Sequence, residues 1–168
     1  MDAMEAIFTR RSIRKYTKDP VPESLVNELL KAAMAAPSAR NEQPWHFVVV
    51  SDHKILDEIP KFHPFSKMLV EAPVAILVCG DTAPLTDTYW IQDCSAAIEN
   101  ILIAARAKGL GAVWLGIYPL ETRYKQVQKL LNIPEKVIPL GLISIGYPAE
   151  EKPPANRFNA SRVHYNKW

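Results

Sequence analysis

Pro37-Ser-Ala-Arg-Asn-Glu-Gln-Pro-Trp-His46 is the stretch that decides the fold. Two prolines enclose a short polar loop, between a helical pattern that ends at Pro37 and an aromatic, β-branched run that begins at Trp45. The side-chain amides of Asn41 and Gln43 each carry a donor and an acceptor, which suits the polar edge of a bound ring or its hydroxyl groups. The same residue types are common in ordinary turns. The loop alone therefore leaves both interpretations open.

The residues on both sides of this loop predict a succession of helices and strands. Helical spacing of apolar residues, with capping residues and terminating Gly or Pro, predicts helices at 3–8, 23–36, 55–59, 86–108 and 120–131. Aromatic and β-branched runs predict strands at 45–51, 74–80, 111–117 and 137–147. This order indicates an α+β fold, with a mixed central sheet flanked by helices. We expect one domain over residues 1–168, with 148–168 as an extended C-terminal tail.

The helix predicted at 86–108 is apolar on more than one face. A helix that faces water on one side shows a narrower apolar stripe. This breadth is expected either of a central core helix or of one that a second subunit covers. The aromatic pair Tyr89-Trp90 near its start suits either packing or one wall of a ligand site.

Composition excludes several classes of function. The 168 residues carry a formal charge of +2, with no field strong enough to gather nucleic acid, and no apolar run reaches the length of a membrane span. The sequence starts without a secretory signal, so we expect a cytoplasmic protein. Cys79 and Cys94 are predicted to be buried and reduced, and the four scattered histidines indicate no metal site.

Arg10-Arg-Ser-Ile-Arg14 places three arginines and a hydroxyl directly after the first helix. Guanidinium groups bind phosphate oxygens in a bidentate manner, and a serine hydroxyl adds a further hydrogen bond. The segment therefore suits a phosphate group, although a solvated basic turn has the same composition.

A glycine-rich run, Gly109-Leu-Gly-Ala-Val-Trp-Leu-Gly116, follows a predicted helix and leads into a predicted strand. The dinucleotide-binding fingerprint has the reverse order, strand then loop then helix. We therefore reject a Rossmann interpretation of this run.

Together, in this order and spacing, the three segments resemble the nitroreductase family over nearly the whole chain. The resemblance implies an α/β sandwich that forms a homodimer, with two noncovalent FMN sites at the subunit interface. It also implies NADH or NADPH as co-substrate and a small-molecule electron acceptor, with no nucleic-acid or membrane partner.

The resemblance also assigns cofactor-binding positions. Arg10, Arg11, Ser12 and Arg14 correspond to residues at the FMN phosphate, ribityl chain and pyrimidine side. The partner subunit is expected to contribute Pro37, Ser38, Ala39 and Asn41, with Gln43 in the same loop. Leu115 and Gly116 are expected to present backbone N–H groups near the flavin ring. Arg162 is expected to complete the phosphate site, with Arg157 as the alternative.

The implied mechanism needs no catalytic side chain, because FMN supplies the redox chemistry. A cation such as Arg14 near the pyrimidine side stabilises the reduced flavin more than the oxidised form. We expect ping-pong transfer of hydride from NAD(P)H to nitroaromatic, quinone or flavin acceptors. The alternatives are an enzyme of the same fold with different flavin chemistry, and a flavin-binding sensory or interaction module.

Overall fold

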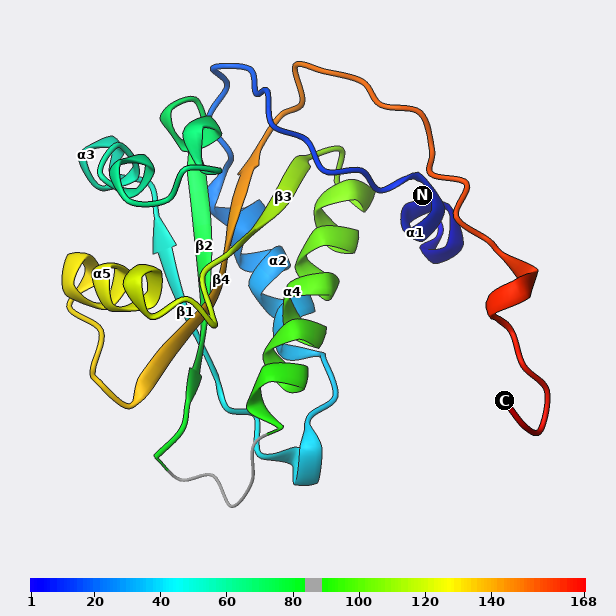
Figure 1. The fold of residues 1–168 in the computed structure, drawn as a ribbon. Coiled ribbons are helices and arrows are strands. Elements are labelled where there is room, and N and C mark those ends of the chain that lie inside the picture. Colours follow the sequence, from blue (N-terminus) through cyan, green and yellow to red (C-terminus); the bar gives the residue numbers. More distant parts are fainter. Residues whose placement is uncertain (84–88) are drawn as a thin grey trace.

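The computed structural model describes residues 1–83 and 89–168 and consists of helices on both faces of one sheet (Figure 1). The helices are α1 (Ala3–Thr9), α2 (Glu23–Met34), α3 (His53–Leu56), α4 (Trp90–Ala107) and α5 (Glu121–Leu131). The strands are β1 (Trp45–Val50), β2 (Val74–Asp81), β3 (Gly111–Gly116) and β4 (Val137–Gly146). Short 3₁₀ helices lie at Ala39–Asn41, Ile59–Lys61, Lys67–Val70 and Ala160–Arg162. The predicted α+β fold is confirmed.

The four strands lie in the order β1-β2-β4-β3, and every neighbouring pair is antiparallel. The expected mixed sheet is therefore wrong for these strands. The crossover through α4 does give β2 and β3 the same direction, but β4 inserts between them and runs against both. Among the described residues, parallel pairing is limited to an isolated bridge between Ser12 and Ala112.

The sheet is covered on both faces, which explains why β2 is apolar at nearly every position. Val74, Ile76 and Val78 belong to the core shared with α2 and α4, whereas Ala75 and Leu77 face the opposite core. Figure 1 shows α2 and α4 on one side of the sheet and α3 and α5 on the other. Successive side chains of a strand point to opposite faces, so a strand between two helical layers needs no polar positions. The expected burial of free Cys79 and Cys94 is confirmed.

Helix α4 is the central helix of one face. Residues Thr86–Thr88, where the sequence predicts its start, lie outside the described residues; the helix begins at Trp90. It packs against α2, α1 and the sheet, and its buried side chains include Cys94, Ile98 and Ile101. Gly109 follows its end with a φ of 75°, a conformation that glycine adopts without steric cost. Packing within one chain thus accounts for the apolar breadth of α4, and cover by a second subunit stays a prediction.

The end of the C-terminal tail extends away from the body of the domain (Figure 1). Residues 156–168 are exposed, and the aromatic side chains of Phe158, Tyr165 and Trp168 are 83%, 84% and 101% exposed. Figure 1 shows this tail reaching past α1. Among the described helices, none is both long and apolar enough to cross a membrane.

Candidate functional site

The Arg10–Arg14 segment runs along the outer edge of β3. The backbone N–H of Ile13 donates to the carbonyl oxygen of Ala112 at 3.1 Å, beside the parallel bridge between Ser12 and Ala112. A Cβ on Gly111 would lie 2.7 Å from Cγ2 of Ile13. Gly111 is therefore needed for the close approach of two backbones, and Gly109 ends α4. The glycine-rich run has structural roles at these two positions, consistent with rejecting a dinucleotide fingerprint.

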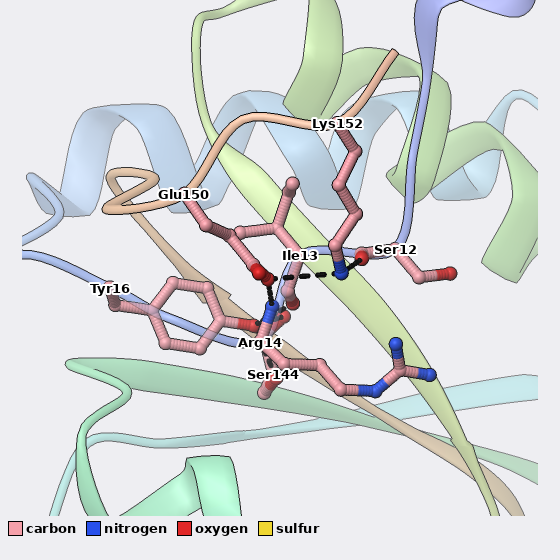
Figure 2. Close-up of polar contacts among 7 residues, drawn as sticks. All are labelled: Ser12, Ile13, Arg14, Tyr16, Ser144, Glu150 and Lys152. Atoms are coloured by element: carbon pink, nitrogen blue, oxygen red, sulfur yellow. Dashed lines mark hydrogen bonds and ion pairs between the residues drawn. The ribbon is translucent and has the colours of Figure 1, made fainter. Parts of the chain in front are cut away.

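The backbone of this segment is fixed from two sides (Figure 2). On the sheet side, the hydroxyl of Tyr16 donates to the Ile13 carbonyl at 2.8 Å and lies 2.6 Å from Oγ of Ser144. Burial raises the pKa of this phenol, so it keeps its proton as a donor. On the opposite side, the Arg14 N–H donates to Oε1 of Glu150 at 2.6 Å. The segment is thus held beside β3 by an isolated bridge and side-chain hydrogen bonds.

One cavity of about 320 Å³ lies beside α1 and the end of α4. Four cationic side chains line it: Arg10, Arg11, Arg106 and Lys152. All four have neighbours that orient them. Arg10 Nε lies 3.4 Å from Oε1 of Glu99, and Arg106 Nε donates to Oγ1 of Thr9 at 2.9 Å. The Arg11 guanidinium donates to the Pro153 carbonyl, and Lys152 Nζ donates to the Ser12 carbonyl at 2.7 Å. Glu150 and Glu151 also line the cavity. The cluster of guanidinium groups is suited to a phosphate.

A second cavity of about 540 Å³ lies against the other face of the same edge. Arg14, Lys67 and Arg123 supply its charge, and none of the described residues that line it is acidic. Phe65 and Trp114 supply aromatic surface, and the Arg123 guanidinium lies 5.9 Å from the centre of the Phe65 ring. A planar anionic group would find both charge and stacking surface here. Arg10 and Arg14, although close in sequence, thus line different cavities.

Gly116 presents its backbone to the open edge of β3. Its carbonyl oxygen accepts from Nε2 of His63 and from a guanidinium nitrogen of Arg123, both at 3.0 Å. The N–H and C=O of one strand residue point to the same side, so the Gly116 N–H also faces this edge. A Cβ at Gly116 would meet nothing within 4 Å.

Leu115 does not share this exposure. The N–H of Ile117 donates to Leu140 of β4, and Leu115, two residues earlier, has the same backbone direction. By this geometry, the N–H of Gly116 is available to a ligand at this edge and that of Leu115 is turned toward β4.

His63 is neutral, with its proton on Nε2. The Phe65 N–H donates to Nδ1 at 3.3 Å, which leaves Nε2 as the donor to Gly116. Burial lowers the pKa of this imidazole, which keeps the neutral form dominant near pH 7.

The 37–43 loop has a strained but well-bonded backbone. Arg40, Asn41 and Gln43 have φ values of 51°, 57° and 50°, in the left-handed region. The Ala39 N–H donates to Oδ1 of Asp93 at 3.0 Å, and the Gln43 side-chain amide donates to Oδ1 of Asn41 at 3.0 Å. Backbone strain of this kind concentrates at ligand sites, where surrounding contacts hold it in place.

The two predicted parts of the site lie at opposite ends of α4 in one chain. The loop is bonded to Asp93 in the first turn, whereas Arg106 in the last turn contacts Thr9, directly before Arg10. At about 1.5 Å per residue, these two anchor points are roughly 20 Å apart along the helix. A single chain therefore does not bring the Arg10–Arg14 segment and the loop together.

The remaining candidates are placed as follows. Arg157 lines a small cavity with Arg10, whereas Arg162 lies in the exposed 3₁₀ helix of the tail. Trp90 is buried and packs edge-on against Tyr118 at 5.2 Å, so it has the packing role, while Tyr89 is 52% exposed. Among the described residues, no group of His, Cys, Asp or Glu is arranged to hold a metal.

The structure adds residues to the two cavities that the sequence did not indicate: His63, Lys67, Arg106, Arg123 and Lys152. Each is an ordinary charged or polar residue far in sequence from the segments that carry a recognisable pattern. Only their position beside the β3 edge distinguishes them.

The structure is thus an α+β protein with two cation-lined cavities beside one edge strand. The profile of the nitroreductase family matches residues 7–64 and 63–147. The chain belongs to this family and is an oxidoreductase. It is 51% identical to a Methanothermobacter thermautotrophicus protein named "Putative NADH dehydrogenase/NAD(P)H nitroreductase", across 100% of this chain and 88% of that relative.

Solved structures agree with this assignment. A protein of the same name from Parabacteroides distasonis has a TM-score of 0.96 at 43% identity, covering 99% of this chain and 98% of that one. An FMN-dependent nitroreductase from Clostridium difficile R20291 has a TM-score of 0.92 at 31% identity, covering 98% and 99%.

Proposed function

We propose that this chain forms a homodimer that binds FMN noncovalently at its interface. It transfers hydride from NADH or NADPH to a nitroaromatic, quinone or flavin acceptor by a ping-pong mechanism. The observation that carries the proposal is the Arg10–Arg14 segment, held along the edge of β3 by the bridge between Ser12 and Ala112. The FMN dependence of the Clostridium difficile relative supports the choice of cofactor.

The residues present fit FMN. A mononucleotide needs cations for one phosphate and a donor for the ring edge. The cavity at Arg10, Arg11 and Lys152 offers the cations, and the outward N–H of Gly116 is the matching donor. The described chain has no strand–loop–helix glycine motif for an adenine dinucleotide.

Each residue then has a separate task. Arg10 and Arg11 hold the phosphate, and Ser12 bonds the ribityl chain. Arg14 places a positive charge at the pyrimidine side, with Lys67 and Arg123 lining the same cavity. When bound, FMN supplies the hydride chemistry. We propose that the tail contributes one further cation, Arg162 or Arg157.

The distance along α4 supports the contribution of a second copy to each site. The loop with Pro37, Ser38, Ala39, Asn41 and Gln43 lies at the opposite end of this helix from Arg10. A twofold dimer brings one protomer's loop to its partner's Arg10–Arg14 segment, and the same contact repeats in the second site.

Cofactor identity tests the proposal. The purified protein should be yellow and carry FMN near one per chain, released by acid and identified by chromatography. FAD in the extract, or no flavin bound after reconstitution with FMN, would overturn it. In anaerobic stopped flow, NADH or NADPH should bleach the bound flavin. Failure of both to do so would favour a sensory or interaction module.

A further inference from the structure

The chain after β4 turns back along the Arg10–Arg14 segment and contacts it repeatedly. The Ala149 N–H donates to the Lys15 carbonyl at 2.9 Å, next to an antiparallel bridge between Tyr16 and Pro148. Glu150 and Lys152 follow in the chain. They form an ion pair, with Lys152 Nζ 3.1 Å from Oε1 of Glu150. The start of the C-terminal tail is thus part of the candidate site's framework.

The two side chains of this pair both bind backbone atoms. Oε1 of Glu150 accepts from the Arg14 N–H at 2.6 Å, and Nζ of Lys152 donates to the Ser12 carbonyl at 2.7 Å. Figure 2 shows the Arg14 guanidinium and the Ser12 hydroxyl pointing away from the Glu150 carboxylate. The pair therefore fixes the backbone and leaves these two side chains to extend elsewhere.

The charge of Glu150 matters for this bond. Hydrogen bonds to an ionised acceptor are shorter and stronger than neutral ones. The Arg14 N–H, followed by the contacts with Lys152, lowers the pKa of the Glu150 carboxyl, so the carboxylate form persists in the native state. An ordinary counter-ion for Arg14 would instead contact the guanidinium.

We propose that Glu150, supported by Lys152, is a positioning residue of the flavin site: it fixes the Arg14 peptide and so aims the Arg14 guanidinium at the cofactor. This inference rests on the proposed FMN site. Glu150 acts through Arg14 and does not touch the cofactor.

The test compares Glu150→Ala and Glu150→Gln with Glu151→Ala. Glu151 lies beside Glu150, is exposed and lines the same cavity, so its removal changes the local charge equally. Titration of apoprotein with FMN, followed by flavin fluorescence, should show a Kd about tenfold higher for Glu150→Ala, as expected for one lost charge-assisted contact. Glu150→Gln, which keeps an acceptor oxygen, should recover part of this loss. Glu151→Ala removes a carboxylate from the same cavity without touching the Arg14 peptide, so it should not weaken FMN binding.

A reduction potential separates positioning from a general loss of structure. Glu150→Ala should lower the potential of bound flavin in the same direction as Arg14→Ala, and the double variant should match Arg14→Ala alone. Two residues that act through one group show this non-additivity. Additive shifts, or an unchanged potential in Glu150→Ala, would overturn the inference.

Hydrogen exchange in the apoprotein gives a readout that needs no cofactor. The Arg14 amide should exchange faster in Glu150→Ala while amides of β2 keep their protection. Equal protection of Arg14 in both proteins would overturn the inference. If the native protein bound no FMN, the proposed function would be overturned instead. The exchange measurement would still show whether Glu150 holds the Arg14 peptide.

Discussion

The Arg10–Arg14 segment and the 37–43 loop are held in place by different means. The segment has extended backbone and lies against β3, where Gly111 leaves room for Ile13. The loop contains three non-glycine residues with left-handed φ values and is bonded to the first turn of α4. One part lies along the edge of the sheet and the other is a strained turn. They lie at opposite ends of α4, and we propose that each chain supplies one half to each of two sites in a dimer.

The largest expected effect is on the sheet-bound half. In Gly111→Ala, the new Cβ would meet Cβ and Cγ2 of Ile13 at 2.8 and 2.7 Å, so the whole segment must shift. Overpacking of this kind costs about 1–3 kcal/mol, which lowers Tm by roughly 2–12 °C in a domain of this size. FMN affinity should fall by at least roughly a hundredfold, because several charge-assisted contacts move together.

Gly116→Ala is the matched control for Tm in the same strand, since its Cβ would meet nothing within 4 Å. Its Tm should stay close to that of the native protein. Equal loss of Tm in both variants would show that the close approach at Gly111 is not what holds the segment.

Sequence patterns identified the Arg10–Arg14 segment and the 37–43 loop, but not the residues that surround them in the fold. Gly109, Pro37 and Pro44 mark ends of elements, and local rules read such signals well. Whether neighbouring strands are parallel depends on the order of the strands in the sheet. The position of β4 between β2 and β3 is set by tertiary packing, and no local sequence pattern indicates it. His63 and Arg123 converge on the Gly116 carbonyl from distant segments, so no spacing in the sequence could reveal them.

The next effect sharpens the contrast within the segment. Arg10 and Arg14 line different cavities, so removing each should affect a different property. Arg10→Ala removes a phosphate contact present in both redox states. FMN affinity should fall about ten- to a hundredfold, while the reduction potential barely moves. The control is Glu99→Gln, which removes the carboxylate partner of Arg10 and keeps the arginine. This variant should not weaken FMN binding.

Arg14→Ala should instead lower the two-electron potential by some tens of millivolts, where about 30 mV corresponds to roughly 1.4 kcal/mol. Hydride uptake in stopped flow should slow accordingly. Potentiometry that shows a shift for Arg10→Ala and none for Arg14→Ala would reverse the assignment of the two arginines.

A smaller effect is the pH dependence of stability that arises from His63, which bonds the Gly116 carbonyl at the edge of β3. Burial depresses the pKa of His63, so the unfolded state binds a proton more readily than the native state. The neutral imidazole's contribution to stability is complete above about pH 6.5 and is lost as pH falls toward the lowered native pKa. Thermal melts should therefore show a steeper loss of Tm between about pH 7 and 5 in the native protein than in His63→Gln. His53→Gln, at an exposed position in α3, should keep the native pH profile.

The sharing of each site between two chains is tested most directly by mixing two defective variants. One carries Arg10→Ala and Ser12→Ala; the other carries Asn41→Gly and Gln43→Gly, where glycine tolerates the left-handed φ. Each alone should bind FMN weakly. After dissociation and random reassociation, half of the dimers are mixed, and each mixed dimer has one intact and one doubly defective site. Tight FMN binding should therefore return to about a quarter of the sites. If both halves of a site came from one chain, every site would remain defective, and no tight binding after mixing would contradict this account.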